Sequence, residues 1–573
     1  MIESSSAASS SASTAPVGEV RTAVDRFSDM FICQLAAADP YFALDIGLGL
    51  ELDEPRFRDY SPAGEDDFTN WMSGLKVELQ LIQSDDAYDE FTRAEILATI
   101  ERQQVLHDRG LHLKDLNVID SPLQRIYESL SFMPSRSDVD RERAFALLRR
   151  VPEALAGYRA SLEEGVRSGR LVGRRQVVAA AKQCKELSNP AGFFRDFATS
   201  MRHPDRGMDE TAVARAEAAY GEFDTFLRTE LAPKSADIES CGRDEHALHI
   251  DHFVGARVDV DDSYSWALDE LSRVSDEMVR AARVIRPGGT LAEVFATLRA
   301  DSEQRLSRVE DVREWVSHVA ETVAKGLRGR EFGEQLRHDT LEVVLAPVSG
   351  TGIYYLPPQA EEDLGKLVWS AGEDGLLDVA KWRDLTTVVH EGIPGHHVQM
   401  VQGTLPGRHR NLWRSKVPGG SGYVEGWALY AESIVEGVGL FSDPAYRLGY
   451  LNSQRLRLAR VVLDIGIHSR IDHPDGGAWS RARAEVFLRE NVVMSDALQA
   501  YEIDRYFGWP GQASSYKLGE RFWWDTRTAF LRARDDASPI AFHEHVLSLG
   551  GGRLDNVRRA LDLESSNDAK FAG

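Results

Sequence analysis

The chain has 573 residues, of which 43% are hydrophobic and 28% charged, a composition typical of a globular protein with a large core. Its 91 acidic and 67 basic residues give a formal net charge of −24. That balance argues against nucleic acid or an anionic membrane as the main partner, because both require basic patches. The three cysteines, at positions 33, 184 and 241, are far apart and form no CxxC motif, which favours a reducing compartment.

The first 19 residues are rich in serine and alanine, and we expect them to form a disordered tail. Glu3 precedes any basic residue and no apolar run follows, so this segment is a poor match to a signal peptide. No run of about 18 apolar residues occurs in the sequence, so no transmembrane helix is expected. Together with the cysteine count, these features predict a cytoplasmic protein.

Residues 20–338 read mainly as helices separated by short breaker segments. In "PEALAGYRASLEEGVRSG", Leu155, Tyr158, Leu162 and Val166 recur at three- and four-residue steps and form one apolar stripe. Similar stripes occur at 20–36, 66–84, 90–108, 141–151, 209–231, 264–284 and 310–326. We therefore expect a helical N-terminal region, and a mainly α protein overall.

The pattern changes near residue 339. "LEVVLAPVSGTGIYYLPP" is rich in β-branched and aromatic residues and is interrupted by Gly and Pro, which predicts one or two short strands. Helical patterns then resume. Residues 339–573 are expected to form a mostly helical catalytic region with a small sheet near the active site.

The segment "TTVVHEGIPGHHVQM" begins like the zinc-protease motif HExxH, but Pro394 stands where the second histidine should be. His390 and His397 would share a face of a straight helix, yet lie about 10.5 Å apart along its axis. One zinc ion cannot bridge that distance. Gly and Pro residues between positions 392 and 395 interrupt helices, so a loop there could bring His396 or His397 beside His390.

The next helical pattern, "SGYVEGWALYAESIVEG", places Glu425 and Glu432 seven residues apart on one face. Two acids on an otherwise apolar helix are costly to bury without a partner. Three-ligand zinc sites combine His nitrogens with a carboxylate and leave a position open for water. We therefore expect one zinc ion per chain, bound by His390, by His396 or His397, and by Glu425.

Four successive blocks, "HEGIPGHHVQ", "YVEGWALYAE", "RLARVVLDIGIHS" and "YFGWPGQASSYKLGE", resemble the bacterial domain-of-unknown-function 885 family, which is regarded as metallopeptidase-like. They are also similar, more distantly, to thimet-type zinc oligopeptidases. That resemblance implies a helical peptidase with a deep cleft walled by its N-terminal region, with Glu425 as a zinc ligand and Glu432 as an acid behind the ligands. A likeness to the Gly-His pair of dipeptidyl-peptidase III favours His396 as the second ligand, whereas helical phase favours His397.

The same site suggests roles for further residues. Glu391 is the expected general base, which takes a proton from the attacking water and delivers it to the leaving amine. The oxyanion needs a donor besides zinc, and Tyr516 and His468 are the candidates. Asp464, four residues before His468, could orient its ring. Simple core packing is an alternative for both Tyr516 and His468.

Substrate binding is predicted at two places. An extended peptide could pair with an edge strand carrying Tyr354 and Tyr355. Arg455, Arg460 and Lys517 could bind a terminal carboxylate, although structural salt bridges are an equal alternative for each. "IDHPDGGAWSRARAE", after His468, departs from the family pattern by extra residues, which weakens the inference about substrate.

The leading hypothesis is a zinc-dependent hydrolase of short peptides or peptide-like small molecules, of the carboxypeptidase or dipeptidase type. One alternative retains the metal site but acts on an amino-acid conjugate in a specialised biosynthetic pathway. Another is a non-catalytic helical binding protein, against which the retained Glu391 argues.

Overall fold

The computed structural model describes residues 21–48, 55–201, 209–237, 240–337, 339–346, 352–358, 364–370, 377–401, 410–535 and 537–563. Helices predominate in these ranges and the strands form only two small sheets, so the mainly α prediction is confirmed. The expected tail at residues 1–19 lies outside the described residues. Within them, no helix combines the length and apolarity needed to cross a bilayer.

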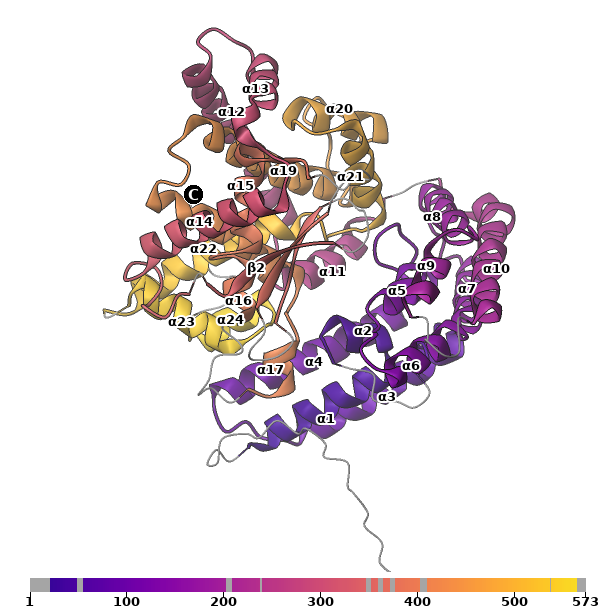
Figure 1. Cartoon of the computed structure of the whole chain (residues 1–573). Coiled ribbons are helices and arrows are strands. Elements are labelled where there is room, and N and C mark those ends of the chain that lie inside the picture. Colours follow the sequence, from indigo (N-terminus) through magenta and orange to yellow (C-terminus); the bar gives the residue numbers. More distant parts are fainter. Residues whose placement is uncertain are drawn as a thin grey trace, which may run out of the picture.

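The helices from α1 to α10 lie together on one side of the molecule (Figure 1). They enclose two hydrophobic cores. One core joins α1, α3 and α4 with Trp413 of α17 (Leu412–Lys416), and the other spans buried side chains from Ala43 to Leu231. The helices are α1 (Ala23–Ala38), α2 (Pro40–Asp45), α3 (Pro62–Gln80), α4 (Ala87–Asp108), α5 (Pro122–Ser131), α6 (Asp138–Leu148), α7 (Val151–Arg167), α8 (Arg174–Leu187), α9 (Phe193–Ser200) and α10 (Glu210–Phe226).

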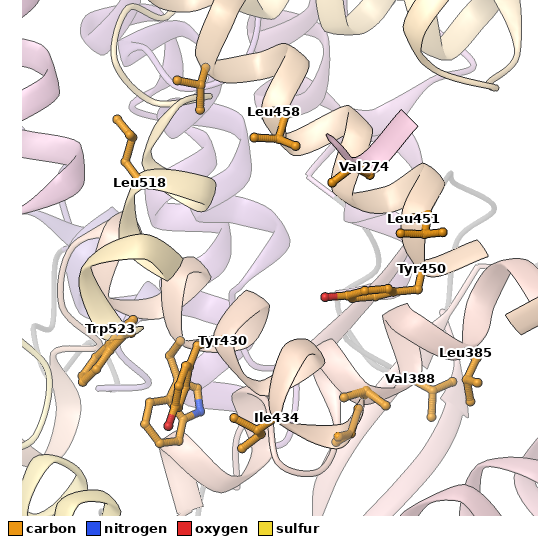
Figure 2. Close-up of a cluster of buried hydrophobic side chains, with 14 of the residues drawn as sticks. Val274, Leu385, Val388, Tyr430, Ile434, Tyr450, Leu451, Leu458, Leu518 and Trp523 are labelled. Atoms are coloured by element: carbon orange, nitrogen blue, oxygen red, sulfur yellow. The ribbon is translucent and has the colours of Figure 1, made fainter. Parts of the chain in front are cut away.

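A third core takes nearly all its buried side chains from Ile250 onward. Figure 2 shows part of it, where Val274 of α12 lies near Leu451 and Leu458 of α19. The predicted N-terminal region 20–338 therefore contributes to all three cores. The helices here are α11 (Arg243–Val254), α12 (Val260–Ile285), α13 (Leu291–Ala300), α14 (Val309–Leu327), α15 (Lys381–Glu391), α16 (His396–Val401), α18 (Ser421–Ile434), α19 (Pro444–His468), α20 (Arg481–Asn491), α21 (Asp496–Gly508), α22 (Ser515–Ala533), α23 (Pro539–Leu549) and α24 (Leu554–Ala560).

The predicted strands form a three-stranded sheet in the order β2-β4-β3. β2 (Leu341–Leu345) runs parallel to β4 (Gly365–Trp369), and β3 (Ile353–Leu356) runs antiparallel to it, with Tyr355 opposite Leu367. β3 is therefore an edge strand of this sheet, and it contacts α15. A separate pair, β1 (Arg305–Leu306) with β5 (Val379–Ala380), leads directly into α15.

Helices α18 and α22 cross at unusually close range because two glycines meet there. A methyl group on Gly426 would lie 2.6 Å from the Cα of Gly519 and 3.0 Å from the backbone nitrogen of Glu520. These distances are far below van der Waals contact, so no side chain fits between the two backbones. The crossing brings the first turn of α22 close to the helix that carries Glu425 and Glu432.

We expect Gly426→Ala to destabilise the protein by roughly 1–3 kcal/mol, because the methyl group would push α18 and α22 apart. Gly74→Ala is the matched control, since Gly74 lies within α3 and has no atom within 4 Å of an added methyl group. That change should stabilise by about 0.5–1 kcal/mol through helix propensity. Denaturant unfolding measures both, and equal effects of the two changes would contradict the close crossing.

Candidate metal centre

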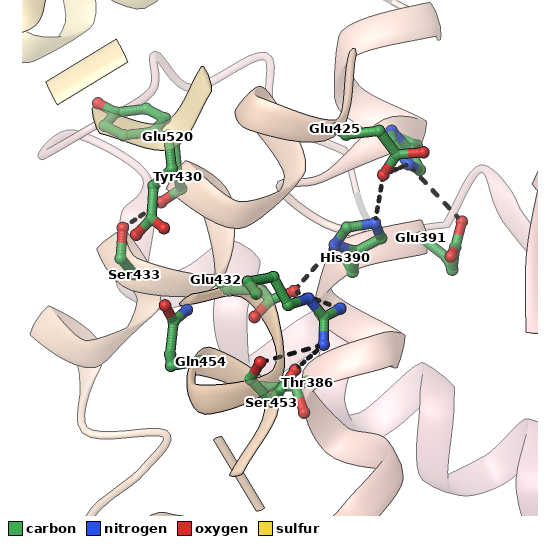
Figure 3. Close-up of polar contacts among 12 residues, drawn as sticks. Thr386, His390, Glu391, Glu425, Tyr430, Glu432, Ser433, Ser453, Gln454 and Glu520 are labelled. Atoms are coloured by element: carbon green, nitrogen blue, oxygen red, sulfur yellow. Dashed lines mark hydrogen bonds and ion pairs between the residues drawn. The ribbon is translucent and has the colours of Figure 1, made fainter. Parts of the chain in front are cut away.

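Two histidines and one glutamate converge at the end of α15. One ligand atom from each of His390, His396 and Glu425 lies within 4.8 Å of the other two. The His390 and His396 rings have centroids 4.8 Å apart and planes inclined at 81°, so they approach from different directions. Figure 3 shows His390 between Glu425 and Glu432. The structure thus brings together three of the residues expected to bind zinc.

A tight turn solves the spacing problem that the sequence posed. α15 ends at Glu391 and α16 begins at His396, so the histidines lie on two helices. A methyl group on Gly395 would lie 1.9 Å from the carbonyl oxygen of His390, so only glycine fits where the chain folds back. The indole nitrogen of Trp427 donates to the carbonyl oxygen of Pro394 at 3.0 Å, which ties the turn to α18.

Glu425 links the two rings through one oxygen. Its Oε2 lies 3.1 Å from Nε2 of His390 and 3.7 Å from Nε2 of His396. Burial opposes ionisation of Glu425, but hydrogen bonds from both histidines hold its pKa well below the usual range. Its side chain is 24% exposed, against 7% and 8% for His390 and His396, so the cluster opens on the Glu425 side.

Glu432 lies behind His390, as the sequence predicted for an acid that supports the ligands. Its Oε1 lies 2.9 Å from Nδ1 of His390 and 3.9 Å from the guanidinium of Arg457. Because this bond occupies Nδ1, it fixes the ring orientation and leaves Nε2 directed at Glu425. Arg457 was not predicted, although it lies on the same helix, α19, as the predicted Arg455 and Arg460.

Glu391, the expected general base, is placed beside the ligands without being one of them. Its Oε2 lies 4.0 Å from Nε2 of His396. Burial raises the pKa of Glu391, and the nearby charges of Glu425 and Glu432 add to that effect, while the two histidines oppose it. A buried carboxylate with a raised pKa is suited to accept a proton near neutral pH.

His397 points away from this cluster. Its Nε2 lies 2.7 Å from the hydroxyl of Thr340 and its Nδ1 lies 3.0 Å from the hydroxyl of Tyr355. Burial lowers the pKa of His397 to about 4. The argument from helical phase, which favoured His397 as the second ligand, assumed an unbroken helix. The turn at Gly395 interrupts the helix, so that argument does not apply. Of the two predicted strand tyrosines, Tyr355 is therefore buried against His397, and Tyr354 is 43% exposed.

His468 and Asp464 are buried next to each other but do not form the expected pair. Nε2 of His468 donates to the carbonyl oxygen of Tyr506 at 2.7 Å, and its Nδ1 accepts from the backbone of Cys241 at 3.4 Å. Asp464 instead pairs with Nε2 of His246 at 3.3 Å and accepts from the Gly511 amide. The prediction that Asp464 orients His468 is wrong, because α11 inserts His246 beside the carboxylate.

The burial of His468 also lowers its pKa to about 4, so its ring is neutral with both nitrogens occupied. That arrangement fits the alternative of core packing. Tyr516, in contrast, lies close enough to the cluster for the charge of Glu425 to raise its pKa further, after burial. The guanidinium carbons of Arg460 and Arg505 lie 4.8 and 5.5 Å from the centre of its ring.

The three basic residues expected to bind a substrate carboxylate all have partners within the protein. Arg460 forms two hydrogen bonds with Glu502, at 3.0 and 2.6 Å. Lys517 bonds Gln454 and Glu520, and Arg455 bonds the backbone of Glu490 and the side chain of Asn491. For Arg460 and Lys517 the geometry matches the structural salt bridges that were the alternative, whereas Arg455 bonds neutral groups. Sequence spacing does not reveal the partners of Arg460 and Arg455, which come from other helices, whereas Glu520 lies only three residues from Lys517.

The donor set fits a zinc ion. Three carboxylates, those of Glu391, Glu425 and Glu432, surround two histidines. The guanidinium of Arg457 lies 3.9 Å from Glu432. Hydrogen bonds to Glu425 and Glu432 overcome burial and raise the pKa of His390 to about 10, so these surroundings strongly favour positive charge. Two imidazoles and one carboxylate are a known catalytic zinc set that leaves one position open.

Comparison with known proteins places the chain in a family. The model for bacterial proteins of unknown function DUF885 matches residues 40–561. The chain belongs to this family. Among curated proteins, none matches it.

Two solved structures resemble the chain over almost its full length. One, from Colwellia psychrerythraea and provisionally named a lipoprotein, is 18% identical with a TM-score of 0.78, over 94% of this chain and 98% of that one. The other, a provisionally named lipoprotein of unknown function from Shewanella oneidensis, is 16% identical with a TM-score of 0.72, over 94% and 99%. At these identities the likeness concerns the fold alone.

The geometry separates the roles of the adjacent histidines. We expect His396→Ala to abolish stoichiometric zinc binding, because His396 supplies one of the three converging nitrogen and oxygen atoms. His397→Ala should retain about one zinc per chain, because His397 bonds Thr340 and Tyr355 instead. Metal analysis of the two purified variants decides between them, and the reverse result would contradict the assignment.

Glu432→Gln should weaken zinc binding by about 10–100-fold, because the variant loses the charged acceptor that orients His390. Glu436→Gln is the matched control, since Glu436 lies one turn further along and pairs with Arg447 at the surface. Competition with a chelator of known affinity measures both. Unchanged affinity in Glu432→Gln would show that His390 does not depend on this bond.

Proposed function

We propose that this DUF885 protein is a zinc-dependent hydrolase that cleaves amide bonds in short peptides or peptide-like small molecules. The convergence of His390, His396 and Glu425 beside the buried Glu391 carries the proposal. A site that only bound metal would not need an additional carboxylate held next to the ligands and outside the ligand set. The earlier resemblance to zinc oligopeptidases supports the same reaction class.

Each residue of the site would then have a distinct task. His390, His396 and Glu425 would hold the zinc ion, which supplies an acidified water molecule and polarises the scissile carbonyl. Glu391 would accept the proton of the attacking water and pass it to the leaving nitrogen. Tyr516 is the better of the two predicted oxyanion donors, because His468 already uses both ring nitrogens within the protein.

The edge strand β3 offers a place for the substrate backbone. β3 pairs with β4 on one side, contacts α15 and exposes Tyr354. An extended peptide added to this edge would run beside the helix that ends in His390 and Glu391. This arrangement supports a peptide over a compact ligand as substrate.

We also propose that the protein acts in the cytoplasm, in keeping with its few and odd-numbered cysteines. The word lipoprotein in the names of the two similar structures describes those proteins and would instead imply a membrane anchor. Fractionation of cells that express the natural gene distinguishes the two locations.

The central test of the reaction is Glu391→Gln, which preserves size and should retain about one zinc per chain. Turnover of a mixed set of short peptides, followed by mass spectrometry, should fall by about 10²–10⁴-fold, because a general base typically contributes that much. A stable folded protein should resist the wild type. Near-normal turnover in the variant would overturn the mechanism. Absence of turnover in the zinc-loaded wild type would overturn the proposed peptidase activity.

A further inference from the structure

Arg102, on α4, is a largely enclosed cation without a partner. Among the described residues, none forms a hydrogen bond or ion pair with its guanidinium. Other arginines nearby are paired: Arg553 contacts Asp251 and Asp555, and Arg125 contacts Asp120. Burial lowers the pKa of Arg102 to about 9. An unpaired charge in such surroundings is unfavourable by itself and is a ready site for an anion.

The side chain faces open space on two sides. Arg102 contributes to the walls of two cavities, of about 950 and 330 Å³, which lie between the N-terminal helices and the third core. His252 of α11 is a wall residue of both cavities as well, and its imidazole has no hydrogen-bond partner among the described residues. Burial, and then the charge of Arg102, hold the pKa of His252 well below its usual range, so its ring is a neutral donor.

The wall of the larger cavity has one more arginine than carboxylates, although the whole chain is strongly acidic. Six arginines line it against five carboxylates: Arg93, Arg102, Arg257, Arg553, Arg558 and Arg559. One of those carboxylates, Glu95, accepts bonds from Arg553 and Asn556, and its burial raises its pKa to about 7. The net charge of −24 therefore does not describe this cavity, which favours an anionic group.

The same cavity reaches the helix that carries Glu425. Gly419 and Gly420, just before α18, are among its wall residues, and a methyl group on Gly420 would lie 3.6 Å from the carbonyl oxygen of His252. Glu425 follows Gly420 by five residues, about 7.5 Å along a helix axis. Three extended residues, at about 3.3–3.6 Å each, cover at least that axial distance. In Figure 1, α4 lies on the side of the N-terminal helices that faces α24.

We propose that Arg102, assisted by His252, binds the free α-carboxylate of a short peptide whose scissile bond lies at the metal centre. The inference rests on the proposed peptidase function and names its substrate class: peptides with a free C-terminus. A guanidinium binds a carboxylate through two parallel hydrogen bonds, which selects for geometry as well as charge. Carboxylate recognition is thus assigned to Arg102, which has no partner among the described residues, and not to Arg455, Arg460 and Lys517, which have partners.

Binding to an inactive full-length chain tests this directly. Zinc-loaded Glu391→Gln protein is titrated with tetra-alanine and with its C-terminal amide, and binding is followed by calorimetry. The free acid should bind about 10–100-fold more tightly, as expected for hydrogen bonds to a charged group. Adding Arg102→Gln should abolish that difference, and Arg102→Lys should restore part of it. Arg109→Gln, which removes an exposed charge at the end of the same helix, should leave it unchanged.

Several results would overturn the inference. These are equal affinity of the acid and the amide, no binding of either, or an unchanged preference in Arg102→Gln. The unfolding midpoint of Arg102→Gln should be no lower than that of its parent, because the lost charge has no partner; a clear drop would indicate a structural role. Binding is measured without turnover, so the two proposals can fail separately. If the Glu391→Gln protein prefers the free acid but the wild type cleaves no peptide, only the proposed function is overturned.

Discussion

The site depends on one electrostatic constraint: three carboxylates share a largely buried volume with two imidazoles. Glu391, Glu425 and Glu432 cannot all remain ionised there unless positive charge is close. Protonated His390 can satisfy part of this demand, as its raised pKa shows. A divalent cation bound at the Nε2 atoms and at Glu425 would satisfy more of it and would leave Glu432 to hold the ring of His390.

Two close backbone approaches make this arrangement possible. The turn at Gly395 folds α16 back against α15, so two histidines six residues apart meet in space. The contact between Gly426 and Gly519 lets α22 lie close to α18, and α22 carries Tyr516. Both contacts are between backbones, so a side chain at either place would displace a residue of the site. The N-terminal helices form part of the walls of the two cavities that Arg102 lines. Arg102 is not among the residues of the hydrophobic core to which α4 contributes.

Local sequence patterns were enough to predict part of this structure. The helical stripes, the short strands and the two acids on α18 each follow from residues adjacent in the chain. A turn between His390 and His396 could be predicted because Gly and Pro interrupt helices. Its direction could not be predicted, so either His396 or His397 could have been the second metal ligand. Family membership over residues 40–561 agrees with the four sequence blocks.

Most of the failures concern partners that come from distant segments. Asp464 was matched with His468 because they are four residues apart, yet His246 from another helix takes its carboxylate. Arg460 was predicted to bind substrate, yet Glu502 from another helix pairs with it. Lys517 pairs with Glu520 three residues along its own helix, a partner that spacing alone could have suggested. The sequence also could not show that Arg102 has no partner among the described residues, because that depends on packing. Periodicity identifies which residues share a helix face, and only the fold determines what that face meets.

Anomalous diffraction at the zinc absorption edge, from crystals of the intact chain grown with zinc, tests the central claim most directly. The account predicts one strong peak per chain, about 2.0–2.2 Å from Nε2 of His390, Nε2 of His396 and a carboxylate oxygen of Glu425, with Glu391 beside it and not bound. A peak coordinated by His397 or His468, or full zinc occupancy elsewhere with none at His390, would contradict it.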